Sequence, residues 1–160
     1  KRADVFLEPI NDTMEEFQIV TPMQQAAFLA QIAHESGQLR YTEEIASGEA
    51  YEGRKDLGNT EPGDGRRFKG HGLIQLTGRD NHEKYAAYKG ISVDDVLEYL
   101  QTPDGATNVS GWFWSTRKLN NLADQEDFRG ITRKINGGYT HLTERTAFYV
   151  AAKAALGAVA

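Results

Sequence analysis

Hydrophobic residues recur with helical spacing along most of this chain, and no long stretch alternates between apolar and polar positions. The clearest segment begins at Thr21-Pro22 and ends at Gly37. Thr21 and Gln24 fit a capping box, Pro22 fits a first helical turn, and Gly37 fits a helix stop. Because apolar residues surround most of this segment, we expect a buried central helix.

Similar start and stop signals predict six further helices. They cover residues 6–17, 80–89, 93–100, 103–118, 124–135 (with Asp124 as the cap) and 142–156. The fold is therefore predicted to be mainly α.

Residues 46–78 differ from the rest, because they contain eight glycines among charged and aromatic residues. A long glycine-rich stretch inside a compact domain is usually functional or disordered. Within it, residues 72–76 could form a short strand. We expect this region to form a small loop-and-hairpin lobe beside the helices.

Composition excludes several classes of protein. A chain of 160 residues can bury a core as one domain, 1–160. The absence of cysteine excludes disulfides, thiolate zinc sites and a cysteine nucleophile. No apolar run approaches the roughly 20 residues of a membrane helix, so no membrane insertion is expected. Because the chain begins with Lys1, we expect a domain excised from a longer protein.

The net charge of −5 is unevenly distributed. Residues 41–64 hold seven acidic and two basic residues, whereas residues 65–90 hold six basic and two acidic ones. The two segments could face each other across a groove, or they could be two solvated faces without functional meaning. An acidic total argues against nucleic acid as a partner.

Two glutamates are candidates for acid and base chemistry. Glu35 ends the predicted central helix, where a carboxyl suits a general acid, although composition alone favours a satisfied carboxylate at a helix end. On one continuous helix Glu44 would lie on the opposite face. Because the helix ends at Gly37, the chain can turn so that Glu44 faces Glu35. Glycoside hydrolysis needs two carboxylates across a gap, but such pairs are common.

Other chemistries have little support. The histidines lack metal-ligand spacing, and the glycine-rich segment fits neither a dinucleotide motif nor a P-loop, so no metal or cofactor is expected. The run Trp112-Phe113-Trp114 could stack on sugars, but adjacent helical residues point in different directions. We expect two of the three to belong to the core.

Three blocks stand out in the chain: residues 27–37 (AFLAQIAHESG), 70–79 (GHGLIQLTGR) and 135–138 (INGG). They resemble the signature blocks of glycoside hydrolase family 19, in family order, and the resemblance extends from about residue 6 to 156. Residues 49–65 and the lack of cysteine resemble the phage and bacterial branch. The resemblance implies a lysozyme-like α+β fold with two lobes and an inverting hydrolase.

The resemblance also implies roles for single residues. Glu35 matches the general acid, Glu44 the carboxylate that activates water, and Thr77 the residue that holds this water. The substrate cleft is implied to include His34, Gln75, Asn81, Asn136 and Arg145.

Two details of this site go beyond the matched roles. We hypothesise that Arg145 and Asn136 lie close enough to the pair of carboxylates to keep Glu44 ionised while Glu35 stays protonated. His71 stands where the family usually has arginine, so a group that titrates near neutrality replaces a permanent cation. Substrate grip or pH optimum could change as a result.

The leading hypothesis is a muramidase that cleaves peptidoglycan glycan strands, as an endolysin or an interbacterial toxin domain. A chitinase and a non-catalytic glycan-binding module are the alternatives. We expect a monomer that is made in the cytoplasm and acts on the cell wall in the periplasm, by an export route that the sequence does not show. A toxin would also have a cognate inhibitor protein as its partner.

Overall fold

A computed structural model describes residues 2–158, which are mainly α-helical as predicted. The elements are α1 (Arg2–Glu16), α2 (Pro22–Glu35), the 3-10 helices η1 (Glu49–Tyr51) and η2 (Lys55–Leu57), α3 (Asp64–Arg67), α4 (Arg79–Lys89), α5 (Val93–Tyr99), α6 (Pro103–Thr116), α7 (Leu119–Asp124), α8 (Phe128–Asn136) and α9 (Leu142–Leu156). In this described part of the chain, the helices are too short or too polar to cross a membrane.

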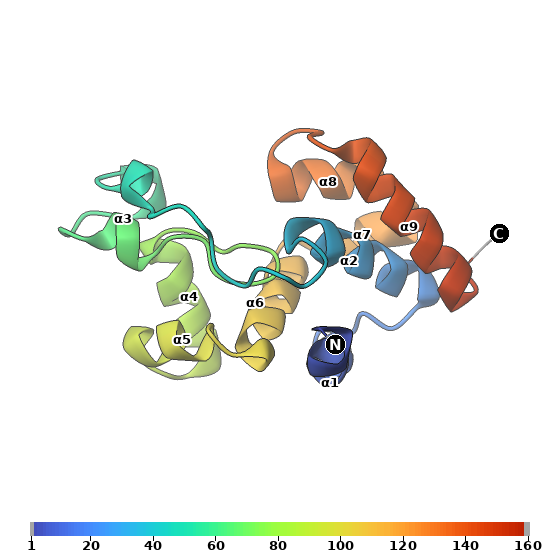
Figure 1. Cartoon of the computed structure of the whole chain (residues 1–160), viewed down its shortest axis with the longest axis horizontal. Helices are drawn as coiled ribbons and strands as arrows, with labels where there is room; N and C mark the ends of the chain where they lie inside the picture. The colour runs from blue at the N-terminus through green and yellow to red at the C-terminus, as the bar shows by residue number, and fades with distance from the viewer. Residues whose placement is uncertain (1, 159–160) are drawn as a thin grey trace.

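The helices form two lobes (Figure 1). Helices α1, α2 and α7 to α9 make the larger lobe, and α3 to α5 make the smaller one, with α6 between them. Two loop segments run side by side from the larger lobe to the smaller one. Backbone hydrogen bonds join them, from Gly72 N to Thr42 O at 2.8 Å and from Glu44 N to Gly70 O at 2.8 Å.

Helix α2 is the buried centre of the larger lobe. Its capping box is present, because Thr21 accepts from Gln24 N while the Gln24 side chain accepts from Thr21 N. Ala26, Ala27 and Phe28 are fully buried, and the helix packs chiefly against α9. Small alanines allow this close packing, which fixes both ends of α2 in the lobe.

The strand predicted over residues 72–76 is wrong. His71 and Leu76 form one isolated bridge, with backbone bonds of 3.0 and 2.8 Å, and turns lie between them. The backbone N–H of Leu73 donates to Ala106 O, and that of Ile74 donates to Ser110 Oγ. Because α6 takes these two donors, they are not available to a β-ladder.

The helix predicted from Asp124 to residue 135 is also wrong at its start. Asp124 ends α7, and α8 begins after Asp127, whose carboxylate accepts from Gly130 N at 2.8 Å. Glu126 has a left-handed backbone (φ 58°), which separates the two helices. The helix predicted over 103–118 ends at Thr116.

The first helix starts at Arg2, four residues before the predicted start at residue 6. The Arg2 side chain donates to Leu39 O and Arg40 O, and the spacing of residues along the chain does not reveal these contacts. Of the aromatic run, Phe113 and Trp114 are buried and Trp112 is half-buried, which confirms that two belong to the core.

Gly72 should be a position where alanine is poorly tolerated. Its φ is +105°, and an added Cβ would lie 2.5 Å from Val109 Cγ1. We expect Gly72→Ala to lower the free energy of unfolding by roughly 2–4 kcal/mol, because left-handed strain and overpacking add. Gly53→Ala is the control: φ is +72° with nothing within 4 Å, so strain alone should cost about 1 kcal/mol. Urea denaturation that gave equal losses would contradict this.

Candidate active site

Glu35 is the last residue of α2, and its side chain is 23% exposed. It follows a buried helix whose position is set by its capped start and by its packing against α9. A carboxyl at this point is therefore held on a rigid element while it still reaches solvent. Such a position lets the carboxyl reach a bound substrate within hydrogen-bond distance.

Arg145 of α9 contacts Glu35 directly. Its Nη1 lies 2.6 Å from Glu35 Oε1 and 2.7 Å from Gln31 Oε1, and its Nε donates to Thr140 O at 3.1 Å. The side chain is only 2% exposed, so its charge is compensated inside the lobe. The packing of α2 on α9 places the guanidinium at Glu35, one member of the candidate pair, whereas its effect on the ionisation of Glu44 stays a prediction.

Gln31 is a member of this cluster that the sequence analysis did not assign. Its Oε1 accepts from Arg145, and its Nε2 donates to Thr132 Oγ1 of α8 at 3.0 Å. Gln31 is fully buried within the apolar run 26–33, one turn before Glu35. A polar residue inside such a run, at i−4 from a candidate acid, was the signal that could have identified it.

After α2 the chain turns sharply, as the position of Gly37 predicted. Gly37, Gln38 and Leu39 have consecutive left-handed conformations, with φ of 59°, 60° and 67°. The Ser36 hydroxyl accepts from Leu39 N at 2.8 Å and stabilises this turn. The segment that carries Glu44 therefore leaves the helix axis and runs beside residues 70–72.

The Glu44 carboxylate has two donors of its own. Tyr51 donates its hydroxyl to Oε1 at 2.7 Å, and Gly70 N donates to Oε2 at 3.0 Å. The bond to Glu44 raises the pKa of the Tyr51 hydroxyl, which keeps it protonated as a donor. Tyr51 lies on η1, and the sequence analysis did not assign it, although it is an aromatic residue in the glycine-rich segment shortly after Glu44.

Gln75 and Thr77 lie on the returning arm of the 70–78 hairpin, and both are half-buried. Gln75 packs over Gly70: a Cβ on Gly70 would lie 2.7 Å from Gln75 Oε1. Since Gly70 N binds Glu44, Gln75 lies beside the candidate base. Among residues 2–158, the Thr77 hydroxyl has no hydrogen-bond partner, so it is available to an external group.

The other predicted cleft residues are more dispersed. His34 lies next to Glu35, with its Nδ1 3.3 Å from Glu144 Oε1 and its ring 5.1 Å from that of His141. The Asn81 amide donates from Nδ2 to Thr77 O at 2.9 Å. Asn136 is the exposed last residue of α8, and no contact to Glu44 is seen.

The acidic and basic segments of the sequence pair directly with each other in the smaller lobe. Arg79 binds Asp64 through two hydrogen bonds of 2.8 and 2.7 Å, and Lys69 Nζ lies 3.3 Å from Glu43 Oε1. The Asp64 pKa is lowered chiefly by its hydrogen bonds from Arg79. Much of the charge partition therefore stabilises the loops of this lobe.

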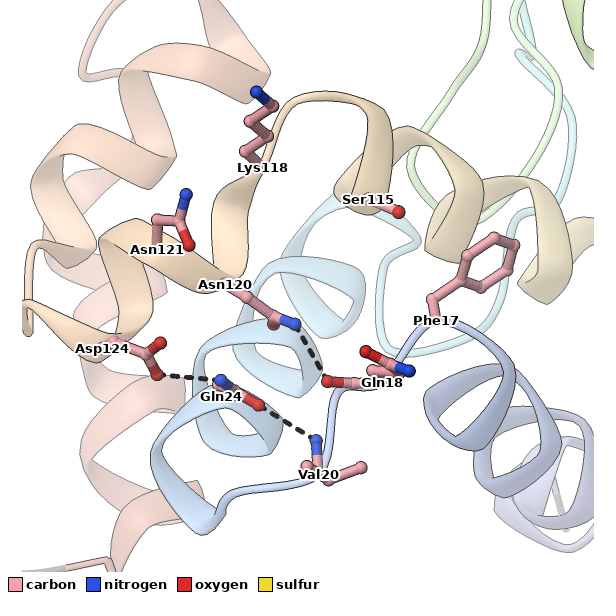
Figure 2. Close-up of a pocket in the computed structure, with 9 residues that line it drawn as sticks. All are labelled: Phe17, Gln18, Val20, Gln24, Ser115, Lys118, Asn120, Asn121 and Asp124. Carbon is pink, nitrogen blue, oxygen red and sulfur yellow. Dashed lines mark hydrogen bonds between the residues drawn. The ribbon is translucent and has the colours of Figure 1, made fainter.

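A depression of about 640 Å³ lies away from these carboxylates, between the α1–α2 and α6–α7 connections (Figure 2). Two of its amides are engaged within the protein: Gln24 Nε2 donates to Asp124 Oδ1, and Asn120 Nδ2 donates to Gln18 O. These groups hold the connections in place. In the described residues, no three histidine or acidic side chains are grouped to bind a metal ion.

Known proteins resemble this chain in both sequence and fold. No family model matches it. It is 30% identical over 175 aligned positions to a glycosyl hydrolase family 19 domain-containing protein of Haemophilus influenzae, and the match covers 89% of this chain and 84% of that protein. An endochitinase of Arabidopsis thaliana is 36% identical over 114 positions, which are 71% of this chain but only 38% of the plant protein.

Solved structures show the same fold. A bacterial family 19 chitinase superposes with a TM-score of 0.80 at 18% identity, covering 98% of this chain and 92% of that one. Chitinase C of Streptomyces griseus superposes with a TM-score of 0.77 at 20% identity, covering 98% and 90%. These matches confirm the predicted lysozyme-like architecture. With the Haemophilus relative matched over most of both chains, this chain belongs to glycosyl hydrolase family 19.

Proposed function

We propose that this glycoside hydrolase is a muramidase, which cleaves the β-1,4 bond between N-acetylmuramic acid and N-acetylglucosamine with inversion. One observation carries the proposal: two carboxylates are held on separate elements by separate donors. Arg145 binds Glu35 on α2, and the Tyr51 hydroxyl and Gly70 N bind Glu44 on the loop that follows. An inverting mechanism needs two carboxyl groups with room for water between them.

The chemistry divides between the two carboxyl groups. Glu35 gives its proton to the glycosidic oxygen as the bond to C1 breaks, and Glu44 takes a proton from the water that attacks C1 from the opposite face. Each Glu44 oxygen accepts one protein hydrogen bond and keeps a second lone pair for the water. The unpaired Thr77 hydroxyl would orient this water, while Gln75, beside Gly70, would contact the sugar.

Several observations support peptidoglycan as the substrate. Residues 49–65 resemble the phage and bacterial branch of the family, and the bacterial relative is matched over 84% of its length, compared with 38% for the plant endochitinase. A phage or prophage lysin and an interbacterial toxin domain would both use this activity on the periplasmic cell wall. In the second case, an inhibitor protein would cover the Glu35 and Glu44 region.

Chitin hydrolysis is the second candidate, because both solved structures compared above are named chitinases. The same two carboxylates would act on a polymer without lactyl-peptide branches. A non-catalytic glycan-binding module is the third reading. The intact polar contacts of both carboxylates argue against it, since binding alone does not need them.

Replacing either carboxylate should abolish turnover without unfolding the protein. We expect Glu35→Gln and Glu44→Gln each to lower the rate of reducing-end release from peptidoglycan by about 10²- to 10⁴-fold, because each removes one half of the acid–base pair. Glu98→Gln, an exposed carboxylate on α5, should retain wild-type activity. Near-normal turnover by either site variant, with a normal melting temperature, would refute the assignment. Tight binding by an inactive wild type would favour the glycan-binding module.

Substrate class is decided by a direct comparison. We expect the wild type to release reducing ends faster from purified peptidoglycan than from soluble chitin oligomers, because a muramidase must accommodate the lactyl-peptide branch. Rates are compared at equal concentrations of β-1,4 bonds, with Glu35→Gln as the blank. Faster cleavage of chitin oligomers would reverse the order of the two candidates.

A further inference from the structure

Two buried histidines lie behind the candidate base. His71 is 3% exposed and His82 is fully buried, with His71 Nδ1 2.9 Å from His82 Nε2. His82 Nδ1 lies 2.7 Å from Gly78 O, and His71 Nε2 lies 3.6 Å from Glu43 Oε1. The acid and base steps proposed above use none of these side chains.

The direction of both hydrogen bonds follows from the last group in the series, the carbonyl oxygen of Gly78. A carbonyl oxygen only accepts, so His82 Nδ1 must donate to Gly78 O. A neutral His82 then has a lone pair on Nε2, and His71 must donate to it from Nδ1. In neutral His71 the Nε2 atom therefore has no hydrogen to offer Glu43.

The backbone of His71 joins the two segments that carry the candidate base and the water-holding residue. On one side, its neighbours Gly70 and Gly72 bond to Glu44 and Thr42. On the other side, His71 exchanges two backbone bonds with Leu76, the residue before Thr77. A displacement of His71 would thus move both segments.

The side chain of His71 adds a link that the backbone does not supply. His82 lies on the first turns of α4, and its other partner, Gly78, follows Thr77 directly. We propose that His71 is a positioning residue: its Nδ1 hydrogen bond to His82 fixes the Glu44 segment relative to Thr77, so that the attacking water meets both. This inference rests on the proposed roles of Glu44 and Thr77.

The surroundings keep this hydrogen-bond order at neutral pH. His71 faces Glu43, Lys69 and Glu44, and His82 faces His71 and the ring of Phe68. Burial lowers the pKa of both imidazoles, that of His82 to about 4.

Protonation of the two rings would have different effects. A proton on His71 Nε2 adds a donor toward Glu43 and leaves the bond to His82 intact. A proton on His82 Nε2 removes the acceptor for the His71 Nδ1 hydrogen, so the two rings can stay bonded only with the direction reversed and His71 protonated on Nε2. Because the His82 pKa is lowered, the donor order described above holds above about pH 4 and is lost as the pH falls through that value.

Replacing His71 with asparagine or glutamine distinguishes the positioning hydrogen bond from a packing role of the side chain. The asparagine amide nitrogen lies near the position of Nδ1, whereas the glutamine amide nitrogen lies near that of Nε2 and faces Glu43. We expect His71→Asn to keep kcat within about threefold and His71→Gln to lower kcat about 10- to 100-fold on the preferred glycan, because small misplacements of catalytic groups cost rate. KM should change less than about twofold in both, since sugar contacts remain.

The outcomes are distinct. Unchanged kcat in His71→Gln, or equal losses of kcat in both variants with folding intact, would overturn the inference, because the donor at the Nδ1 position would not matter. A wild type that cleaves neither peptidoglycan nor chitin would refute the proposed function itself. An active wild type whose His71 variants keep the same kcat would refute only the positioning role.

A spectroscopic signature tests the hydrogen-bond order without turnover. In ¹⁵N spectra of the wild type at pH 7, both His71 and His82 should be neutral and protonated on Nδ1. His71→Asn should leave His82 in this form. An Nε2-protonated His82 would leave it no acceptor for His71 and would overturn the inference.

Discussion

A buried cation determines how the larger lobe holds its part of the active site. Arg145 is 2% exposed, and a guanidinium removed from water is tolerated only when it is paired with an opposite charge and hydrogen-bonded. Its partners come from α2 (Glu35 and Gln31) and from Thr140 O before α9. The same contacts that stabilise the charge therefore fix the candidate acid, and they require α2 and α9 to pack together.

The candidate base is held by different means. Glu44 is bound by a backbone N–H and a phenol, within a loop pair whose other bonds run to α6 and α4. Glu35 thus belongs to the larger, helical lobe, and Glu44 belongs to a loop segment that leads to the smaller lobe. Their separation depends on how the two lobes join, which suits a reaction that needs a water molecule between them.

Loops of this length need compensation for their entropy, and the smaller lobe supplies it with polar contacts. Asp64 is buried and bound by Arg79, and Glu52 accepts from the N–H groups of Gly63 and Gly65. These pairs use the acidic and basic segments that are adjacent in the sequence. The charge pattern could have indicated a ligand groove. Instead, many of these charged side chains bond to each other or to the backbone and stabilise the loops near Glu44.

Features that depend on local interactions could be predicted from the sequence, whereas features that depend on contacts between distant segments could not. Helices α2, α4 and α9 were predicted well because their caps and stops are local, as Thr21 with Gln24 shows. The family resemblance likewise identified Glu35, inside its first block, and Glu44, shortly after that block, as candidates, since residue type and order are enough for that. Gln31 and Tyr51 were missed because their roles arise from contacts with α9 and with the loop segment that precedes η1.

The sequence by itself therefore determined the helical class, the family and the candidate carboxylates, all of which depend on neighbouring residues along the chain. Only the tertiary structure decided that residues 72–76 turn instead of forming a strand, because the donors of Leu73 and Ile74 are taken by α6. It also decided that Arg145 binds Glu35 and that His71 meets His82. These outcomes depend on which groups distant segments bring together, because a buried donor or charge bonds to the partner that packing places beside it.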